Sequence, residues 1–148
     1  PADRAVARPA ALGLAGPAEP EELAAVRRQA VDALVAAEAV GRSGVVHIAD
    51  VAVLAAVADR ADLAAALIDT HRGARATLGP NAVPVARAVC AWLEANRDTD
   101  AAAERLFVHP NTVRNRVQRF TEVSGIDPGS TFGGVNAWWL CRNWLSQS

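Results

Sequence analysis

The stretch 98–120, DTDAAAERLFVHPNTVRNRVQRF, constrains the fold of this chain more than any other segment. Residues 101–106 are good helix formers, and Asp98 or Thr99 can accept the free backbone N–H groups at the start of a helix. Pro110 suits the first position of a second helix, because its φ angle is fixed and it lacks an N–H group. The sequence therefore predicts two helices joined by a tight turn.

The second of these helices has an apolar back and a polar front. Val113, Val117 and Phe120 fall at i, i+4 and i+7 and form one apolar stripe. At about 100° per residue, the opposite side carries amide, hydroxyl and guanidinium groups, which match the base edges in a major groove. The stretch 105–119 holds four Arg and no acidic residue, although the net charge of the chain is −1. These features indicate DNA contact, whereas the plainer interpretation is a solvated amphipathic helix.

The segment AAAERLFVHPNTVRNRVQRF resembles the C-terminal helix-turn-helix of the PucR/CdaR family of bacterial transcription regulators. His109, Asn111 and Thr112 stand as the His-x-Asn-Thr element, followed by Arg114 and Arg116. The resemblance runs from about residue 83 to the C-terminus. With the helix pattern, it predicts a mostly α fold, in which a trihelical, Fis-like helix-turn-helix domain with a C-terminal helix follows a helical segment with one short strand. It further implies a cytoplasmic protein whose effector metabolite is sensed by a region missing from this chain.

The candidate DNA-binding residues lie on and beside the second helix: His109, Asn111, Thr112, Arg114, Asn115, Arg116, Gln118 and Arg119. Asn111, Thr112 and Asn115 are candidates for base edges or phosphates, and Arg114 and Arg119 for backbone contacts. Arg116 either pairs with Glu104 or contacts DNA, and His109 either binds a phosphate or braces the turn. Phe107 occupies a position where many helix-turn-helix proteins have Gly, and we expect its ring to pack into the core.

The whole chain divides into three predicted regions. Residues 1–20 are rich in Pro and Gly and predict a linker or disordered lead-in. Residues 21–80 predict a helix, a short strand at 45–48 and further helices, and residues 81–148 the helix-turn-helix domain. One strand cannot form a stable sheet, so it either pairs with a partner chain or belongs to a sheet whose other strands lie elsewhere. The family resemblance favours the second alternative, with residues 21–80 as the remnant of a degenerate GGDEF-like domain.

The last predicted helix, 135–145, is rich in tryptophan: it contains Trp138, Trp139 and Trp144. Either these rings fill a small core, or one face of them forms a dimer contact, because aromatic residues concentrate at interface cores. A homodimer would bind paired half-sites on duplex DNA. The three Trp are therefore the candidate dimer-interface residues.

Several other function classes lack support in the sequence. It contains no GxSxG, HExxH or CxxC motif and no phosphate-cradling Gly loop, so we predict no enzyme, no cofactor and no metal site. Cys90 and Cys141 are interpreted as buried thiols. No run of about 18 uncharged apolar residues predicts a membrane span. The chain begins with Pro and contains no Met, which indicates a fragment of a longer protein.

We predict a sequence-specific DNA-binding transcription regulator whose recognition helix lies near 110–123. The alternative is a helical protein-interaction or dimerisation module that does not bind DNA. The two differ in whether duplex DNA binds at low salt, where phosphate contacts are strongest.

Overall fold

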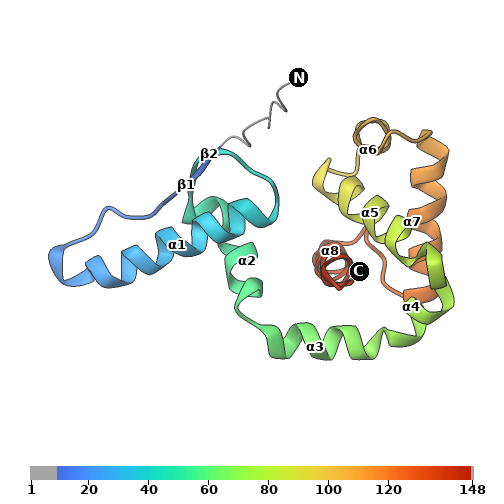
Figure 1. Cartoon of the computed structure of the whole chain (residues 1–148), viewed down its shortest axis with the longest axis horizontal. Helices are drawn as coiled ribbons and strands as arrows, with labels where there is room; N and C mark the ends of the chain where they lie inside the picture. Colours follow the sequence, from blue (N-terminus) through green and yellow to red (C-terminus); the bar gives the residue numbers. More distant parts are fainter. Residues whose placement is uncertain (1–9, 148) are drawn as a thin grey trace, which may run out of the picture. The chain divides into compact units, whose positions relative to one another are not determined.

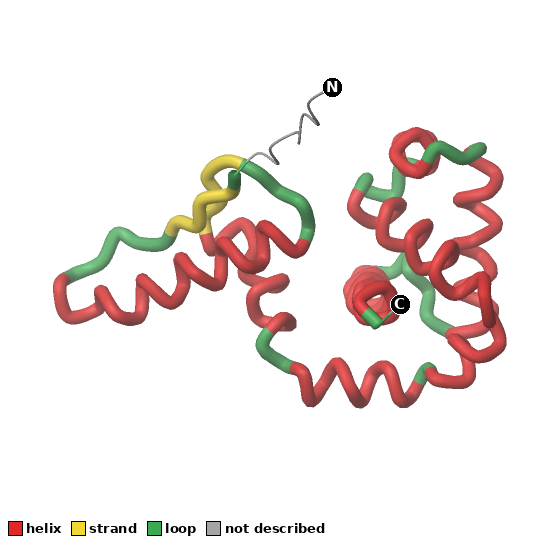
Figure 2. The backbone as a smooth tube through the Cα atoms, viewed as in Figure 1, coloured by secondary structure: helices red, strands yellow, loops and turns green. Residues whose placement is uncertain are grey.

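The computed structural model describes residues 10–147 and consists of two compact units (Figure 1). The first unit ends at Ala61 and the second begins at Asp62. As predicted, the structure is mostly helical, and its strands are confined to the first unit (Figure 2).

The first unit is a strand–helix–strand motif followed by a helix. Strand β1 (Ala11–Leu14) pairs in parallel with β2 (Gly44–His47), and the 3-10 turn η1 (Pro20–Glu22) and helix α1 (Leu23–Ala39) connect them. Helix α2 (Ile48–Ala58) follows β2 directly. Small residues let these elements approach closely, since a Cβ on Gly13 of β1 would lie 1.9 Å from the carbonyl oxygen of Ala30 in α1. The core of this unit is formed by Ala33, Ala36, Ala37, Val46 and Val51.

One prediction for the first unit needs correction. The short strand predicted at 45–48 exists, but its partner is β1, which lies inside the stretch 1–20 that we predicted to be a lead-in. His47 caps the following helix α2, because its Nδ1 accepts a 3.1 Å hydrogen bond from the Ala49 N–H. The imidazole Nε2 of His47 also lies 3.3 Å from the carbonyl oxygen of Gly16, so this side chain links the end of β2 to the loop after β1.

The second unit is helical among its described residues. Helices α3 (Ala61–Thr70) and α4 (Arg72–Leu78) lead through the 3-10 turn η2 (Gly79–Asn81) to α5 (Ala82–Glu94). They are followed by α6 (Thr99–Leu106), α7 (Pro110–Ser124) and α8 (Thr131–Ser146) (Figure 1). Helix α5 is central, because its buried side chains contact both α7 and α8.

The core of the second unit extends into the segment that we had assigned to the preceding region. Ala74 and Leu78 of α4 pack into the same cluster as Val89 of α5, Phe120 of α7 and Leu140 of α8. Burial of these side chains explains why the boundary between the units lies at 61–62 and not near residue 80.

Helix α8 is longer than predicted and buries one of its tryptophans. It begins at Thr131, because the Ser130 hydroxyl accepts a hydrogen bond from the Gly133 N–H and caps the helix. Trp144 was a candidate dimer-interface residue, and this prediction was wrong. Its ring is 1% exposed and contacts Phe120 edge to face at 6.1 Å, so it belongs to the core.

Candidate nucleic-acid interface

The predicted pair of helices joined by a tight turn is formed by α6 and α7. The Asp98 carboxylate caps α6, accepting hydrogen bonds from the Asp100 and Ala101 N–H groups at 2.9 and 3.0 Å. The Nδ1 atom of His109 caps α7 by accepting a 3.1 Å hydrogen bond from the Asn111 N–H. Pro110 occupies the first position of α7, as its geometry predicts.

Phe107, in the turn between the two helices, does not behave as predicted. Its φ angle is +54°, in the left-handed region, and its side chain is 95% exposed. The neighbouring residues Leu106 and Val108 fill the core in its place, packing against a cluster that includes Ala103 and Val113. The expectation that the Phe107 ring packs into the core was therefore wrong, although the turn has the left-handed backbone that usually selects Gly.

Helix α7 buries one side and exposes the other. Val113 and Phe120 are fully buried and Val117 is half-buried, so the predicted apolar stripe is confirmed. The opposite side of α7 is open to solvent, and the candidate residues on one of its flanks are half-buried. The exposed candidates are Asn111, Arg114, Asn115, Gln118 and Arg119, and the half-buried ones are Thr112 and Arg116.

Hydrogen bonds within α7 hold several of these exposed side chains. Arg114 donates to the Asn111 side-chain oxygen at 2.5 Å. Glu122, one turn further along, accepts from Gln118 at 3.1 Å and from Arg119 at 3.3 Å. Since the Arg119 and Glu122 side chains are about half exposed, their ion pair contributes little to stability.

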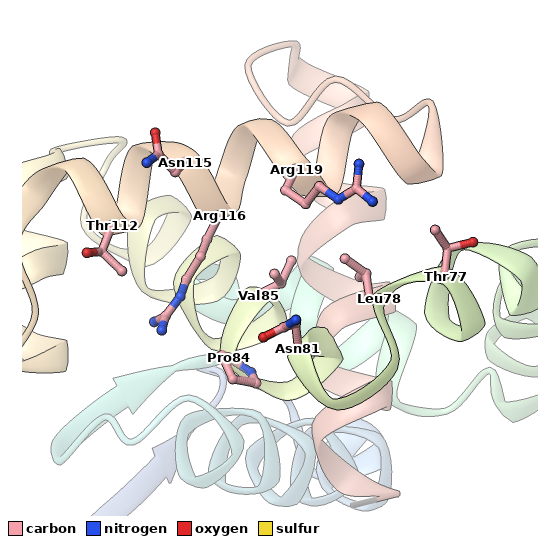
Figure 3. A pocket seen from close by; sticks show the side chains of 9 residues that line it. All are labelled: Thr77, Leu78, Asn81, Pro84, Val85, Thr112, Asn115, Arg116 and Arg119. Atoms are coloured by element: carbon pink, nitrogen blue, oxygen red, sulfur yellow. The ribbon is translucent and has the colours of Figure 1, made fainter.

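Arg116 does not pair with Glu104, so this alternative was wrong. The cation that pairs from the preceding helix is Arg105, whose Nη1 lies 3.0 Å from Oε2 of Glu94. Within residues 10–147, the Arg116 guanidinium has no hydrogen bond or ion pair. It extends from α7 toward Asn81 of η2 and Pro84 in the first turn of α5 (Figure 3).

Arg116 lines a cleft of about 310 Å³ between α7 and the start of α5. Leu78, Pro84 and Val85 supply its apolar lining. Polar side chains line both sides of the cleft. One side has Thr77 of α4 and Asn81 of η2, and the other has four residues of α7: Thr112, Asn115, Arg116 and Arg119. The sequence did not point to Thr77 and Asn81, because residues 77–81 fall at a predicted boundary between regions and local patterns do not show which helix they face.

Of the remaining candidate dimer residues, Trp138 and Trp139 are half-buried. Two charged residues also contact Trp138. Its indole N–H donates to Glu94, and the Arg142 guanidinium carbon lies 5.8 Å from the ring centroid, a cation–π contact.

Cys90 and Cys141 are buried and free, as predicted, and burial raises the pKa of the Cys141 thiol, with a further increase from the neighbouring Cys90. Residues 10–147 contain no group of three or more His, Cys, Asp or Glu side chains placed to hold a metal ion. None of the described helices is long and apolar enough to span a bilayer.

The arrangement of α5, α6 and α7 defines a helix-turn-helix domain, the class of fold that presents one exposed helix to duplex DNA. Residues 85–142 match the PucR C-terminal helix-turn-helix domain. The chain therefore contains a helix-turn-helix domain of a kind found in transcription regulators.

Curated relatives match part of the chain. A segment of 65 residues, 44% of the chain, is 35% identical to uncharacterised protein Rv2242 of Mycobacterium tuberculosis (strain H37Rv). The same identity is found with uncharacterised protein Mb2266 of Mycobacterium bovis. In each case the matched segment spans only 16% of the relative's length.

Proposed function

We propose that this chain is the DNA-binding part of a bacterial transcription regulator and that α7 enters the major groove of duplex DNA. The observation that carries the proposal is the open amide and guanidinium face of α7, in a domain that matches the PucR helix-turn-helix. Asn and Gln side chains can pair with adenine, and Arg with guanine or phosphate.

Positions around α7 suggest a division of roles. At about 100° per residue, Asn111, Asn115 and Gln118 lie near the centre of the exposed side, where a base edge is within reach. Arg114 and Arg119 lie toward its two margins and suit phosphates on the two strands.

His109 supports both roles that the sequence left open. Because its Nδ1 accepts the Asn111 N–H, the neutral ring carries its proton on Nε2. His109 is exposed at the start of α7, so that second N–H can donate to a phosphate while Nδ1 holds the turn.

The proposed regulator acts as a homodimer in the cytoplasm. Trp138 and Trp139, which remain half-buried on α8, are the proposed contact residues. A two-fold dimer would place two α7 helices on half-sites roughly 34 Å apart or a multiple of that distance. An effector metabolite would be sensed by residues outside this chain.

The first unit is proposed to be the remnant of a GGDEF-like domain. A parallel strand–helix–strand motif is consistent with such a sheet, and Leu12 and Val45 leave apolar side chains 61% and 66% exposed. Further strands or another domain layer would cover these side chains.

Binding of a random-sequence duplex, measured by fluorescence anisotropy at several salt concentrations, tests the proposed function. We expect binding at low salt, with a logarithm of the binding constant that falls linearly with the logarithm of the salt concentration. Arg114→Ala and Arg119→Ala should each lower the slope by about 1, whereas Arg28→Ala on α1 is the matched control and should leave it unchanged.

Two results would contradict this proposal. An absence of binding at low salt would favour the protein-interaction module. An equal loss of slope in all three variants would mean that only net charge matters and that α7 is not the contact surface.

A further inference from the structure

The cleft between α7 and the start of α5 has the chemistry of an anion site (Figure 3). Resting on the proposed function, we infer that it seats a phosphate of the DNA backbone. The inference adds Asn81, outside the helix-turn-helix pair, to the DNA-contacting residues. It also gives Arg116 a specific role.

The charge of Arg116 in the cleft is unbalanced, whereas Arg119 pairs with Glu122. Arg116 is half-buried and has no hydrogen-bond or ion-pair partner among residues 10–147, and Arg119 lies on the same flank of α7. No Asp or Glu is among the residues that line the cleft. A partly desolvated guanidinium without a counter-charge attracts an anion, and its planar fork of donors matches phosphate oxygens.

Neutral donors and an apolar lining complete the site. The Asn81 side chain makes no capping hydrogen bond to α5, so its amide is available to a ligand. The Thr112 hydroxyl is a second donor. Pro84 and Val85 provide apolar surface beside the guanidinium, which strengthens its attraction for an anion by lowering the local dielectric constant.

The position of the cleft favours a backbone phosphate over a free one. At about 100° per residue, Thr112, Arg116 and Arg119 lie on one flank of α7, beside the proposed base-reading residues Asn111 and Asn115. When a helix lies in the major groove, its flanks face the sugar–phosphate strands. A phosphate in this cleft would fix the register of α7 without reading sequence.

Charge substitutions at Asn81 test the inference directly. Asn81 is exposed, so Asn81→Asp and Asn81→Arg should fold normally, which circular dichroism can verify. The matched controls are Asn136→Asp and Asn136→Arg, which change the net charge equally at an exposed position on α8. The probe is a random-sequence duplex, measured in the full chain at several salt concentrations.

We expect Asn81→Asp to weaken duplex binding about tenfold more than Asn136→Asp, the effect of disrupting one charge-assisted contact. Asn81→Arg should strengthen binding and raise the salt slope by about 0.9 relative to Asn136→Arg, because one more phosphate is neutralised. Arg116→Ala alone should weaken duplex binding. When Arg116→Ala is also present, Asn81→Arg should bind duplex no more tightly than Asn136→Arg.

A titration with inorganic phosphate at constant ionic strength separates the two sources of the anion. If phosphate binds saturably near Asn81 by NMR while the Asn81 variants bind duplex as their controls do, the cleft holds a small anion and the backbone assignment is overturned. Equal behaviour of Asn81 and Asn136 variants without phosphate binding also overturns it. If the unaltered chain binds no duplex at all, the proposed function fails together with the inference, which is a distinct result.

Discussion

The indole Nε1 of Trp138 donates a 2.9 Å hydrogen bond to Oε1 of Glu94. The other oxygen of the same carboxylate lies 3.0 Å from Nη1 of Arg105. Glu94 thus joins α5 to α6 on one side and to α8 on the other. Its side chain is only 18% exposed, so the two contacts are partly shielded from water.

Removal of this carboxylate should loosen the second unit. Glu94→Ala leaves the Trp138 N–H and Arg105 without their partner, and we expect a loss of about 1–3 kcal/mol of unfolding free energy. Glu94→Gln retains an acceptor for Trp138 and should lose less. Urea unfolding followed by circular dichroism measures both, with Glu104→Ala on the exposed surface of α6 as the control. Equal stability of the Glu94→Ala and Glu104→Ala variants would show that the link contributes nothing.

Phe107→Gly is expected to stabilise the fold. The left-handed backbone at Phe107 costs a residue with a side chain roughly 1 kcal/mol, whereas Gly adopts it freely. Almost no packing is lost, because the ring is 95% exposed. Phe107→Ala keeps the strained backbone without the ring and should change stability little. A lower melting temperature for Phe107→Gly than for Phe107→Ala would contradict this account.

His109 has two nitrogen atoms with separable effects. His109→Ala removes the cap of α7 and should cost about 0.5–2 kcal/mol of stability. His109→Ser supplies a hydroxyl cap and should restore most of that loss. If Nε2 also contacts a phosphate, the Ser variant will regain stability but not duplex affinity. If the Ser variant recovers both stability and duplex affinity, the role of His109 is only to cap α7 and hold the turn.

The buried Cys141 thiol should make stability fall at high pH. Its pKa is raised by burial and by Cys90, so the unfolded chain loses this proton first. The contribution of the protonated Cys141 thiol to stability is therefore complete below the pKa of the unfolded chain, about 8.5. It is lost as the pH rises through the raised pKa of the folded state. Unfolding midpoints between pH 7 and pH 10 measure this loss, and Cys141→Ala should flatten the dependence. A thiol reagent should modify Cys141 more slowly in the native state than after denaturation.

The parts of the fold that local chemistry determines could be read from the sequence. Asp98, Pro110 and the stripe through Val113 and Phe120 define α6 and α7 through capping and periodicity alone. The exposed side of α7 follows from the same stripe.

Features that depend on distant partners could not be read in this way. Strand β1 has the alternation of Leu12 and Leu14, but the pairing with β2 and the packing against α1 that stabilise it involve residues distant in the sequence. Trp144 is buried and Trp139 is half-buried because α5 and α7 pack on one side of α8. The sequence of α8 alone does not show which side that is. Asn81 reaches the cleft for a similar reason, since η2 faces α7 only in the folded unit.

Every tryptophan of the chain lies in the second unit, at positions 92, 138, 139 and 144, and the sequence has no tyrosine. Intrinsic fluorescence therefore senses the melting of one half of the molecule and is silent on the other, while circular dichroism sees the helices of both. Denaturation curves from the two signals would coincide only if the halves unfold as a single cooperative body.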